Sequence, residues 1–254
     1  MNLGELHEPN RKVVGRTIRH FDVVESTNET AKELLEADVE EGLVIWADRQ
    51  VSGRGRQGRA WASPLGGLYM SAILRPKEAH AWILGMLVGM PVIKALRHFG
   101  VLARLKYPND AVYQDRKIAG ILSEGVYRHE TYYVVVGIGV NTNVDLEKLP
   151  PDVQPKATTI KREVSLFVAN DEFLDYLLNQ VDDVYSRYRN TRLEFLLKEY
   201  RGQCATIGKT VRATTAKGTV TGRAYDIAAN GALIIMDEQG QRHEFVEGSV
   251  EVLK

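Results

Sequence analysis

The order of apolar and polar positions predicts alternating strands and helices over residues 1–200. Short β-branched or alternating runs predict strands at residues 15–24, 43–47, 67–74, 104–107, 111–113, 117–126 and 132–140. Apolar residues at helical spacing predict helices at residues 79–99, 173–188 and 193–200. Pro91 should interrupt the first of these helices. A shorter helix should begin at Ser26, with Glu29 completing a capping box. We therefore expect an α/β (α+β) fold.

The composition changes after Tyr200. Residues 210–252 alternate short β-type runs with turn signals such as Asn230-Gly231 and Gln239-Gly240. This pattern predicts a small all-β barrel. We place the domain boundary near Arg201-Gly202, which gives one domain at residues 1–200 and a second at residues 201–254.

Composition and charge narrow the class of protein. The chain has 254 residues, 44% of them hydrophobic, which is enough for a sizeable core. Lys+Arg and Asp+Glu both number 33, so there is no general attraction to nucleic acid or to an anionic membrane. Any recognition of an anion must therefore come from a few cations in one place.

Cysteine use and apolar stretches bear on the compartment. The single cysteine, Cys204, cannot form an intrachain disulfide or a cysteine-based zinc site, and we expect it to be a small buried hydrophobe. Residues 1–11 are polar and carry no signal-peptide pattern, and the apolar stretch at residues 81–93 is too short to span a bilayer. We expect a soluble, cytoplasmic protein.

The most informative segment is the glycine–arginine loop, residues 53–59 (GRGRQGR). It matches the dinucleotide fingerprint G-x-G-x-x-G, but Ala-Trp-Ala-Ser-Pro follows instead of a helix. The P-loop spacing is also present, without the Lys-Ser/Thr that a P-loop requires. What remains is a flexible loop with three arginines, suited to closing over a small anionic ligand. A solvated basic loop, or one that binds a nucleic-acid backbone, is the alternative.

Two further segments carry polar or small residues where a strand pattern does not need them. Alternation places Lys117, Ala119 and Ile121 on one face of a strand, which leaves room for a ligand beside the lysine. An exposed strand lysine is the alternative. Gly137 and Gly139 interrupt a β-branched strand, which indicates a bulge, a close ligand or a plain structural need.

Taken in order, these segments resemble the consecutive motifs of biotin–protein ligases. The matching segments are Ser26-Thr-Asn28, Gly53-Arg-Gly-Arg-Gln-Gly-Arg59, Lys106-Tyr-Pro-Asn-Asp110, Lys117-Ile-Ala-Gly120 and Gly137-Ile-Gly-Val-Asn141. The resemblance runs from about Gly15 to the C-terminus. Tyr107 stands where the family usually has tryptophan. About 14 residues precede the first expected strand, too few for the DNA-binding domain of the repressor-type members. The resemblance is therefore to the monofunctional type.

The resemblance implies both fold and activity. It implies a catalytic domain like that of class II aminoacyl-tRNA synthetases, with a mixed, mainly antiparallel sheet, followed by a small SH3-like β-barrel. It implies that biotin is activated with ATP to biotinyl-5′-AMP and passed to a lysine of a biotin carboxyl carrier protein or domain of a carboxylase. Mg²⁺ should accompany ATP, with its protein ligands left open. A homodimer is expected, and neither nucleic acid nor membrane is an expected partner.

The resemblance also assigns site residues. Biotin contacts are expected from Ser26, Thr27, Asn28, Gln50, Gly53, Arg54, Gly55, Arg56, Lys117, Gly120, Gly137 and Gly139. Contacts to ATP or the adenylate are expected from Arg54, Arg56, Arg59, Trp61, Asn109, Lys117 and Asn141, with Trp61 packing on adenine. Arg56, Lys117 and Asp110 are the expected catalytic residues. Asp110 is a candidate general base or Mg²⁺ partner.

Rival functions stay open at this point. A lipoate or octanoate ligase or transferase would share the fold. A non-catalytic nucleic-acid-binding protein would use the basic loop, although the balanced charge and the missing helix-turn-helix pattern argue against it. A serine hydrolase lacks its G-x-S-x-G motif, and a zinc protease lacks H-E-x-x-H.

Overall fold

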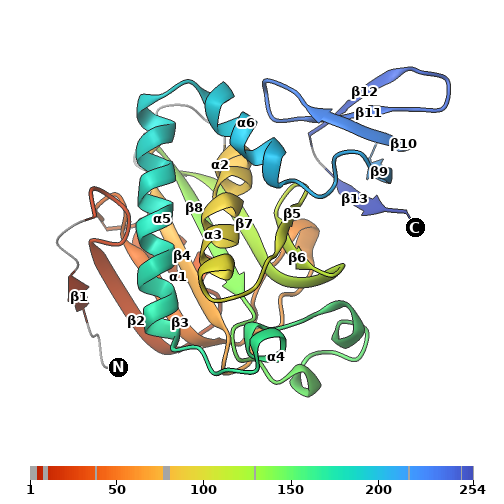
Figure 1. Cartoon of the computed structure of the whole chain (residues 1–254). Coiled ribbons are helices and arrows are strands. Elements are labelled where there is room, and N and C mark those ends of the chain that lie inside the picture. Colours follow the sequence, from red (N-terminus) through yellow and green to blue (C-terminus); the bar gives the residue numbers. More distant parts are fainter. Residues whose placement is uncertain are drawn as a thin grey trace.

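The computed structural model describes residues 5–7, 11–37, 39–76, 81–128, 130–216, 218–246 and 248–253. Its strands form two separate sheets (Figure 1). The first contains β1 (Glu5–His7), β2 (Thr17–Val24), β3 (Val44–Gln50), β4 (Leu68–Leu74), β5 (Arg104–Lys106), β6 (Asp110–Tyr113), β7 (Arg116–Arg128) and β8 (Thr131–Val140). The second contains β9 (Thr210–Thr215), β10 (Gly218–Ile227), β11 (Leu233–Met236), β12 (Arg242–Phe245) and β13 (Ser249–Val252).

In the sequence, three helices lie between strands of the first sheet and three lie between the first sheet and the second. They are α1 (Thr27–Leu34), α2 (Ala81–Leu87), α3 (Gly89–His98), α4 (Ile160–Val164), α5 (Asn170–Asn190) and α6 (Leu193–Gln203). Short 3₁₀ turns span Arg56–Gly58, Leu146–Lys148 and Gln154–Lys156. The first expected strand is preceded by another, because β1 pairs antiparallel with β2.

The first sheet is mixed and mainly antiparallel, as expected. Its strand order is β1-β2-β3-β4-β8-β7-β6-β5, and of its described pairs only β2 and β3 run parallel. The valine-rich strand β8 is central, between β4 and β7. It is buried because helices cover one face and α1 covers part of the other.

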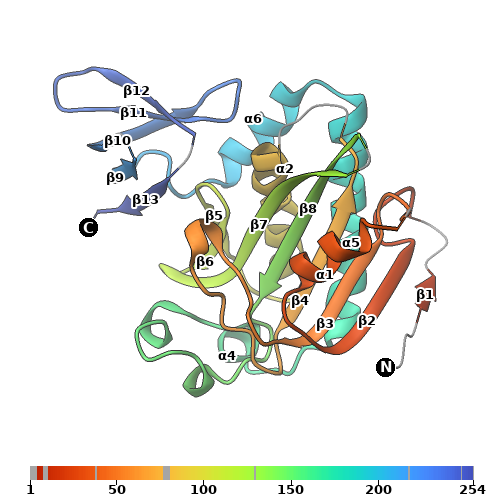
Figure 2. The same ribbon diagram turned by 180° about the vertical axis from the view of Figure 1, so that it is seen from behind.

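The side chains of β8 alternate between the two faces of the sheet. Val134 and Val136 join the larger core with α2, α3 and α5, whereas Tyr133 and Val135 pack with α1. Figure 2, the view from behind, has α1 in front of the sheet and the longer helices beyond it. The face that carries α1 also carries Gly137 and Gly139, because these continue the same alternation.

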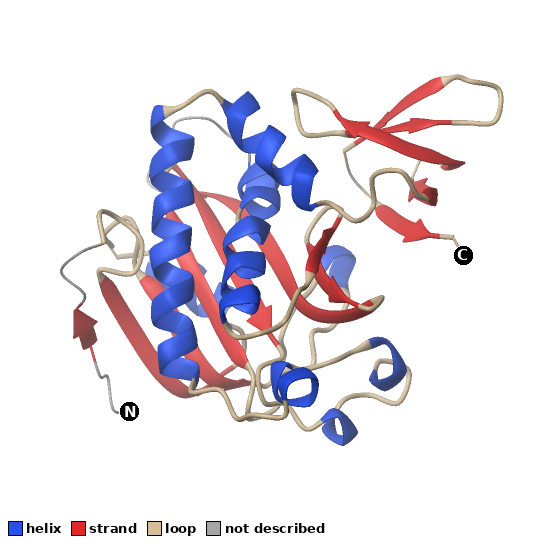
Figure 3. Ribbon diagram, viewed as in Figure 1, coloured by secondary structure: helices blue, strands red, loops and turns tan. Residues whose placement is uncertain are grey.

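The second sheet is antiparallel, with order β12-β11-β10-β9-β13, and in Figure 3 it contains strands and loops without helices. The turns at Asn230-Gly231 and Gln239-Gly240 lie between its strands, as predicted. Helix α6 leads into it, and Arg201 binds it through an ion pair of 2.9 Å to Asp226.

Two local predictions have different outcomes. Pro91 lies in the first turn of α3, and the predicted long helix is interrupted just before it, between α2 and α3. The part of that prediction at residues 79–80 lies outside the described residues. The capping box at Ser26 is wrong: Ser26 occupies the N-cap position of α1 without a side-chain cap bond. Glu29 instead pairs with Lys32 and Arg54.

No described helix is long and apolar enough to cross a membrane.

Candidate active site

A cavity of about 460 Å³ lies on the α1 face of the first sheet. This is the size range of small-molecule sites. The start of α1, the glycine–arginine loop and strands β7 and β8 form its floor and sides. Gly248, Ser249 and Val250 of the second sheet also line it, so both sheets contribute to one pocket.

One part of the pocket is cationic. Six lysine or arginine side chains line the cavity, against three aspartates. The six are Arg54, Arg56, Arg59, Lys106, Lys117 and Lys156, and the three are Asp110, Asp115 and Asp152. A chain with no net charge therefore gathers three surplus positive charges in one cavity. This is the local anion recognition that the balanced composition required.

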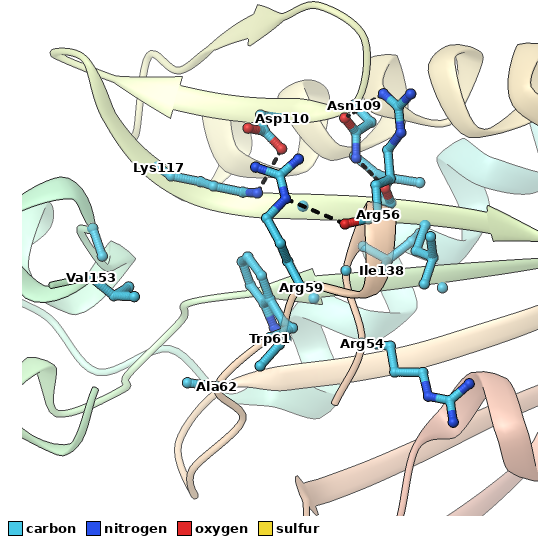
Figure 4. A pocket seen from close by; sticks show the side chains of 18 of the residues that line it. Arg54, Arg56, Arg59, Trp61, Ala62, Asn109, Asp110, Lys117, Ile138 and Val153 are labelled. Carbon is cyan, nitrogen blue, oxygen red and sulfur yellow. Dashed lines mark hydrogen bonds and ion pairs between the residues drawn. The ribbon is translucent and has the colours of Figure 1, made fainter. Parts of the chain in front are cut away.

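Lys117 and Asp110 form the centre of this cationic part (Figure 4). The Lys117 ammonium lies 2.6 Å from the Asp110 carboxylate and 4.9 Å from the centroid of the Trp61 ring. Asn109, the neighbour of Asp110, accepts from Arg56 at 3.4 Å and donates to the Ile121 carbonyl at 2.6 Å. The loop arginine and the strand lysine therefore reach the same hairpin.

The predicted face of Lys117 is wrong, and a β-bulge is the reason. Val112 pairs with Lys117 but Ala111 pairs with Ala119, so β7 has one extra residue, Ile118, at this point. The extra residue turns Lys117 onto the opposite face from Ala119, which is fully buried in the core. Lys117 instead shares the pocket with Gly120, whose absent side chain leaves room beside the ammonium.

The glycine–arginine loop is organised by its own backbone. Gly55 donates to the Arg59 carbonyl at 2.7 Å, and the 3₁₀ turn between them contains Gln57 at a φ of 58°. Arg59 reaches back to the Arg56 carbonyl at 3.3 Å. Arg54 points away from this group in Figure 4 and pairs with Glu29 of α1 at 2.7 Å.

The two glycines of β8 each make space for a protein side chain. A methyl group on Gly137 would overlap the Asn28 amide, and one on Gly139 would overlap the Trp61 indole. The register of β8 with β4 and β7 is continuous at both positions, so neither glycine marks a bulge. The glycines therefore let Asn28 and Trp61 lie flat against the sheet, at neighbouring points of the pocket.

The other part of the pocket is polar and largely neutral. The Gln50 carbonyl oxygen accepts from the Thr27 amide at 2.8 Å, and its NH₂ group donates to Ser63 at 2.7 Å. The Ser71 hydroxyl lies 2.7 Å from that of Thr27 and 2.6 Å from the Asn28 carbonyl oxygen. These groups hold one another in fixed orientations, which suits recognition of an uncharged polar ring.

Tyr107 ties the hairpin beneath the pocket to the second sheet. Its hydroxyl donates to the Phe245 carbonyl at 2.9 Å, and its amide donates to the Thr206 hydroxyl at 2.9 Å. Tyr200 donates to the Pro108 carbonyl at 3.1 Å. Burial raises the pKa of both phenols well above the ordinary value, so both stay protonated donors. Tyr107 therefore provides an aromatic ring and a hydrogen-bond donor at the position where the family usually has tryptophan.

The described residues contain no cluster of three or more histidine, cysteine or acidic side chains that could hold a metal ion. The pocket aspartate at the cationic centre, Asp110, is paired with Lys117. Such a donor set suits a divalent cation that arrives on a polyphosphate and takes one or two carboxylates from the protein. Cys204 is buried, as predicted, and its burial raises the pKa of the thiol.

Known proteins match this chain over both sheets. Residues 20–141 match the Biotin/lipoate A/B protein ligase family, and residues 206–253 match the biotin protein ligase C terminal domain. The chain is 32% identical over 235 residues to the biotin–[acetyl-CoA-carboxylase] ligase of Mycobacterium tuberculosis, covering 85% of this chain and 83% of that protein. The chain belongs to the biotin–protein ligase family.

Two other matches support this membership. The bifunctional ligase/repressor BirA of Bacillus subtilis is 30% identical over 237 residues, which cover 90% of this chain and 72% of that protein. The biotin protein ligase of Aquifex aeolicus, solved in complex with biotin and ATP, superposes with a TM-score of 0.81 at 28% identity. That match covers 93% of this chain and 98% of the other. The ligase fold thus extends over both sheets of this chain.

The structure brings the residues assigned from the ligase resemblance into one pocket, with Gly53 the exception. Gly53, at the start of the loop, is absent from the cavity lining, and its carbonyl accepts from the Trp61 amide at 2.8 Å. Asn141 lines the cavity with its amide donating to the Thr158 carbonyl at 3.1 Å.

Sequence reasoning missed several contributors. Ser71 of β4 and Glu124 of β7 contact Asn28 from the two strands on either side of β8. Residues from 149–157 and 248–250 also line the cavity. The available signals were a serine in the otherwise apolar strand β4 and a glutamate that alternates with Leu122 and Val126 in β7. The residues from 149–157 and 248–250 have no such signal, because their place depends on how distant segments fold together.

Proposed function

We propose that this chain is an ATP-dependent biotin–protein ligase, which forms biotinyl-5′-AMP and transfers biotin to a lysine of a biotin carboxyl carrier protein. The carrying observation is a single pocket with a neutral polar part at Thr27 and Asn28 and a cationic part at Lys117 and Arg56. A ligand with a polar ring at one end and a carboxylate at the other fits this division of charge. Membership of the ligase family supports the same assignment.

The division of the pocket suggests where each substrate binds. We place the fused ring of biotin against Ser26, Thr27, Asn28 and Gln50, over Gly137, with its acid arm directed to Lys117. We place the nucleotide against Trp61, Asn109 and Asn141, with its phosphates at Arg56, Arg59 and Lys117. Gly120 and Gly139 leave room between them. Gly55 and Arg54 would complete the cover, and Gly53 would hold it through its backbone bond to Trp61.

In the first half-reaction an oxygen of the biotin carboxylate attacks the α-phosphorus of ATP. A bond forms between that oxygen and phosphorus, and the bond to the β-phosphate oxygen breaks to release pyrophosphate. Both reactants are anions and repel each other. Lys117 and Arg56 neutralise this charge and hold the reacting atoms in line, so positioning and electrostatics supply the catalysis without a protein nucleophile.

In the second half-reaction the amine of the carrier lysine attacks the acyl carbon of the adenylate. The new amide bond forms, the bond to the phosphate oxygen breaks, and AMP leaves. The attacking amine must lose a proton, and we assign Asp110 as the candidate general base that accepts it. Because Asp110 pairs with Lys117, this role requires the lysine ammonium to turn toward the phosphate first.

Several finer features are part of the proposal. Mg²⁺ would enter with ATP and offset phosphate charge, with Asp110 as its candidate protein ligand. Residues 1–200 would form the catalytic domain and residues 201–254 a second domain that closes the nucleotide end. We also propose a homodimer, and a cytoplasmic location in keeping with the single buried cysteine.

The deciding experiment is native mass spectrometry of the purified protein incubated with biotin and Mg-ATP. We expect a retained mass equal to biotinyl-AMP, and the same spectra report the oligomeric state. Pyrophosphate release with biotin, lipoate or octanoate then separates the ligases that share this fold. Release with lipoate or octanoate and none with biotin would refute the proposal.

A further inference from the structure

Glu124 places a charge between the apolar residues Leu122 and Val126 on the α1 face of its strand. It lies on β7 opposite Val135, on the face covered by α1, and Val126 of the same strand packs into that apolar cluster. The Glu124 side chain is 29% exposed. Moving a carboxylate into such surroundings is unfavourable unless partners compensate it. Its partners therefore explain its presence.

Both oxygens of the Glu124 carboxylate are engaged. One accepts from the Asn28 NH₂ group at 2.6 Å, and the other lies 3.2 Å from the Lys32 ammonium. Lys32 in turn lies 2.6 Å from Glu29, one turn earlier on α1. Helix α1 therefore supplies both the cation that holds Glu124 and the amide that Glu124 orients.

An ionised carboxylate can only accept hydrogen bonds, so the amide orientation of Asn28 is decided. The NH₂ group must face Glu124, and the carbonyl oxygen must face Ser71, 2.6 Å away. Asn28 and Ser71 are 3% and 0% exposed, so water does not offer either group another partner. The Asn28 amide fills the space that a side chain at Gly137 would occupy.

The fixed amide then decides the hydroxyl protons. Ser71 has one hydroxyl proton and must give it to the Asn28 carbonyl oxygen, which has none to offer. The Thr27 hydroxyl, 2.7 Å from that of Ser71, must therefore be the donor in their shared bond. The Gln50 carbonyl oxygen accepts the Thr27 amide proton at 2.8 Å and lies 3.1 Å from the Thr27 hydroxyl, so the hydroxyl proton has only acceptors of the protein within reach, Ser71 and Gln50. Thr27 is left with lone pairs and no proton for a ligand.

We propose that Glu124 is the positioning residue for ring specificity, acting through Asn28 and Ser71 to make the Thr27 hydroxyl oxygen an obligate acceptor. The inference rests on the proposed function, which places biotin's ring at this floor. The matching ligand group is an N–H donor, which the cyclic urea of biotin supplies. A dithiolane ring, as in lipoic acid, has no such donor. Glu124 thus selects between ligands without touching either.

The test is Glu124→Gln, which keeps the shape and removes the requirement that this position accept. Biotin affinity is measured by titration calorimetry, and KM for biotin and ATP by pyrophosphate release. We expect the Kd and KM for biotin to rise by at least about tenfold, with KM for ATP within about twofold. Glu124→Asp, which remains an obligate acceptor, should restore part of the loss. Glu33→Gln, which makes the same change at an exposed position of α1, should behave as the parent protein.

A double-mutant cycle tests the route of the effect. Thr27→Val removes the hydroxyl at the far end of the chain of bonds while keeping its shape. If Glu124 acts through Thr27, then Glu124→Gln should add less than about twofold in the Thr27→Val background. Full additivity would overturn the inference, and so would an unchanged biotin Kd in Glu124→Gln. Thermal melting of each variant separates misfolding from altered recognition. A folded variant should also retain the parent KM for ATP.

The outcome for the proposed function is read separately. A parent protein that binds no biotin and releases no pyrophosphate with it refutes the ligase assignment. A parent protein that does both, with a Glu124→Gln variant of equal biotin affinity, refutes only the role of Glu124.

Discussion

The Lys117 ammonium lies 2.6 Å from the Asp110 carboxylate across two strands, and a β-bulge in the lysine's own strand puts it there. The side chains are 35% and 23% exposed, so a ligand can reach both. A bound phosphate would replace the Asp110 carboxylate as the anionic partner of Lys117. The pair therefore suggests different roles in the two half-reactions.

We expect Lys117→Ala to slow adenylate formation by at least about tenfold, roughly 1.4 kcal/mol of barrier, because the phosphate loses its fixed cation. Asp110→Asn should slow transfer from preformed adenylate by at least about tenfold, because the base is lost, and should slow adenylate formation less, because Lys117 and Arg56 still neutralise the phosphates. Single-turnover assays of each step measure both effects. Equal loss of both steps in Asp110→Asn would contradict this division.

The second prediction concerns Arg56 of the glycine–arginine loop. Arg56→Ala should lower adenylate formation by at least about tenfold, because it removes a cation that reaches Asn109 beside the phosphate site. Arg192, exposed in the turn between α5 and α6, provides the matched control as Arg192→Ala. Near-parental turnover in Arg56→Ala, measured by pyrophosphate release, would remove Arg56 from the mechanism.

Residues 51–60 should change their order when ligand binds. Arg54 is exposed and paired outward with Glu29, so the loop offers trypsin an accessible site without ligand. We expect cleavage after Arg54 to slow at least about fivefold with biotin and ATP, because closure sequesters the backbone. Peptide mapping over time measures this. Equal cleavage with and without both substrates would show that the loop does not close.

The two glycines of β8 should affect different substrates. Gly139→Ala displaces Trp61 and should raise KM for ATP at least about tenfold, with a smaller effect on biotin. Gly137→Ala displaces Asn28 and should do the reverse. Steady-state kinetics with each substrate varied measures the split. The same pattern in both variants would indicate general disruption of the sheet instead.

Buried tyrosines should make the protein lose stability in alkali. Burial raises the pKa of Tyr107 and Tyr200 in the folded state, whereas tyrosine phenols in the unfolded chain titrate near pH 10. Above that pH the folded state holds more protons, so the free energy of unfolding falls, by up to about 1.4 kcal/mol per pH unit for each such phenol. Below it, this contribution is constant.

Tyr107→Phe isolates one of these groups. It should flatten the alkaline slope by about one proton and lower stability at neutral pH by about 1–3 kcal/mol, because the Phe245 carbonyl loses its donor. Urea unfolding at several pH values measures both. Tyr127→Phe, at a position 66% exposed, is the control. A slope that Tyr107→Phe leaves unchanged would show that this phenol is not responsible.

Lys117 shows which features a single strand's sequence predicts and which depend on strand pairing. Strict alternation in the sequence predicted that it shares a face with Ala119, and the bulge reverses this. A bulge arises from pairing between two strands, which a single strand's pattern does not contain. The same limit applies to the capping box. Glu29 has the right spacing, but its carboxylate pairs with Lys32 and Arg54 instead of the N-cap amide.

The sequence by itself determined most elements, the change to an all-β tail and the motif residues that meet in the pocket. These follow from periodicity, turn residues and short motifs, which are properties of adjacent residues. Only the tertiary structure decided which face Lys117 takes, that Gly137 and Gly139 receive Asn28 and Trp61, and that Glu124 orients Asn28. Each of those depends on side chains from segments far apart in the chain, whose distances are set when the sheet and α1 pack together.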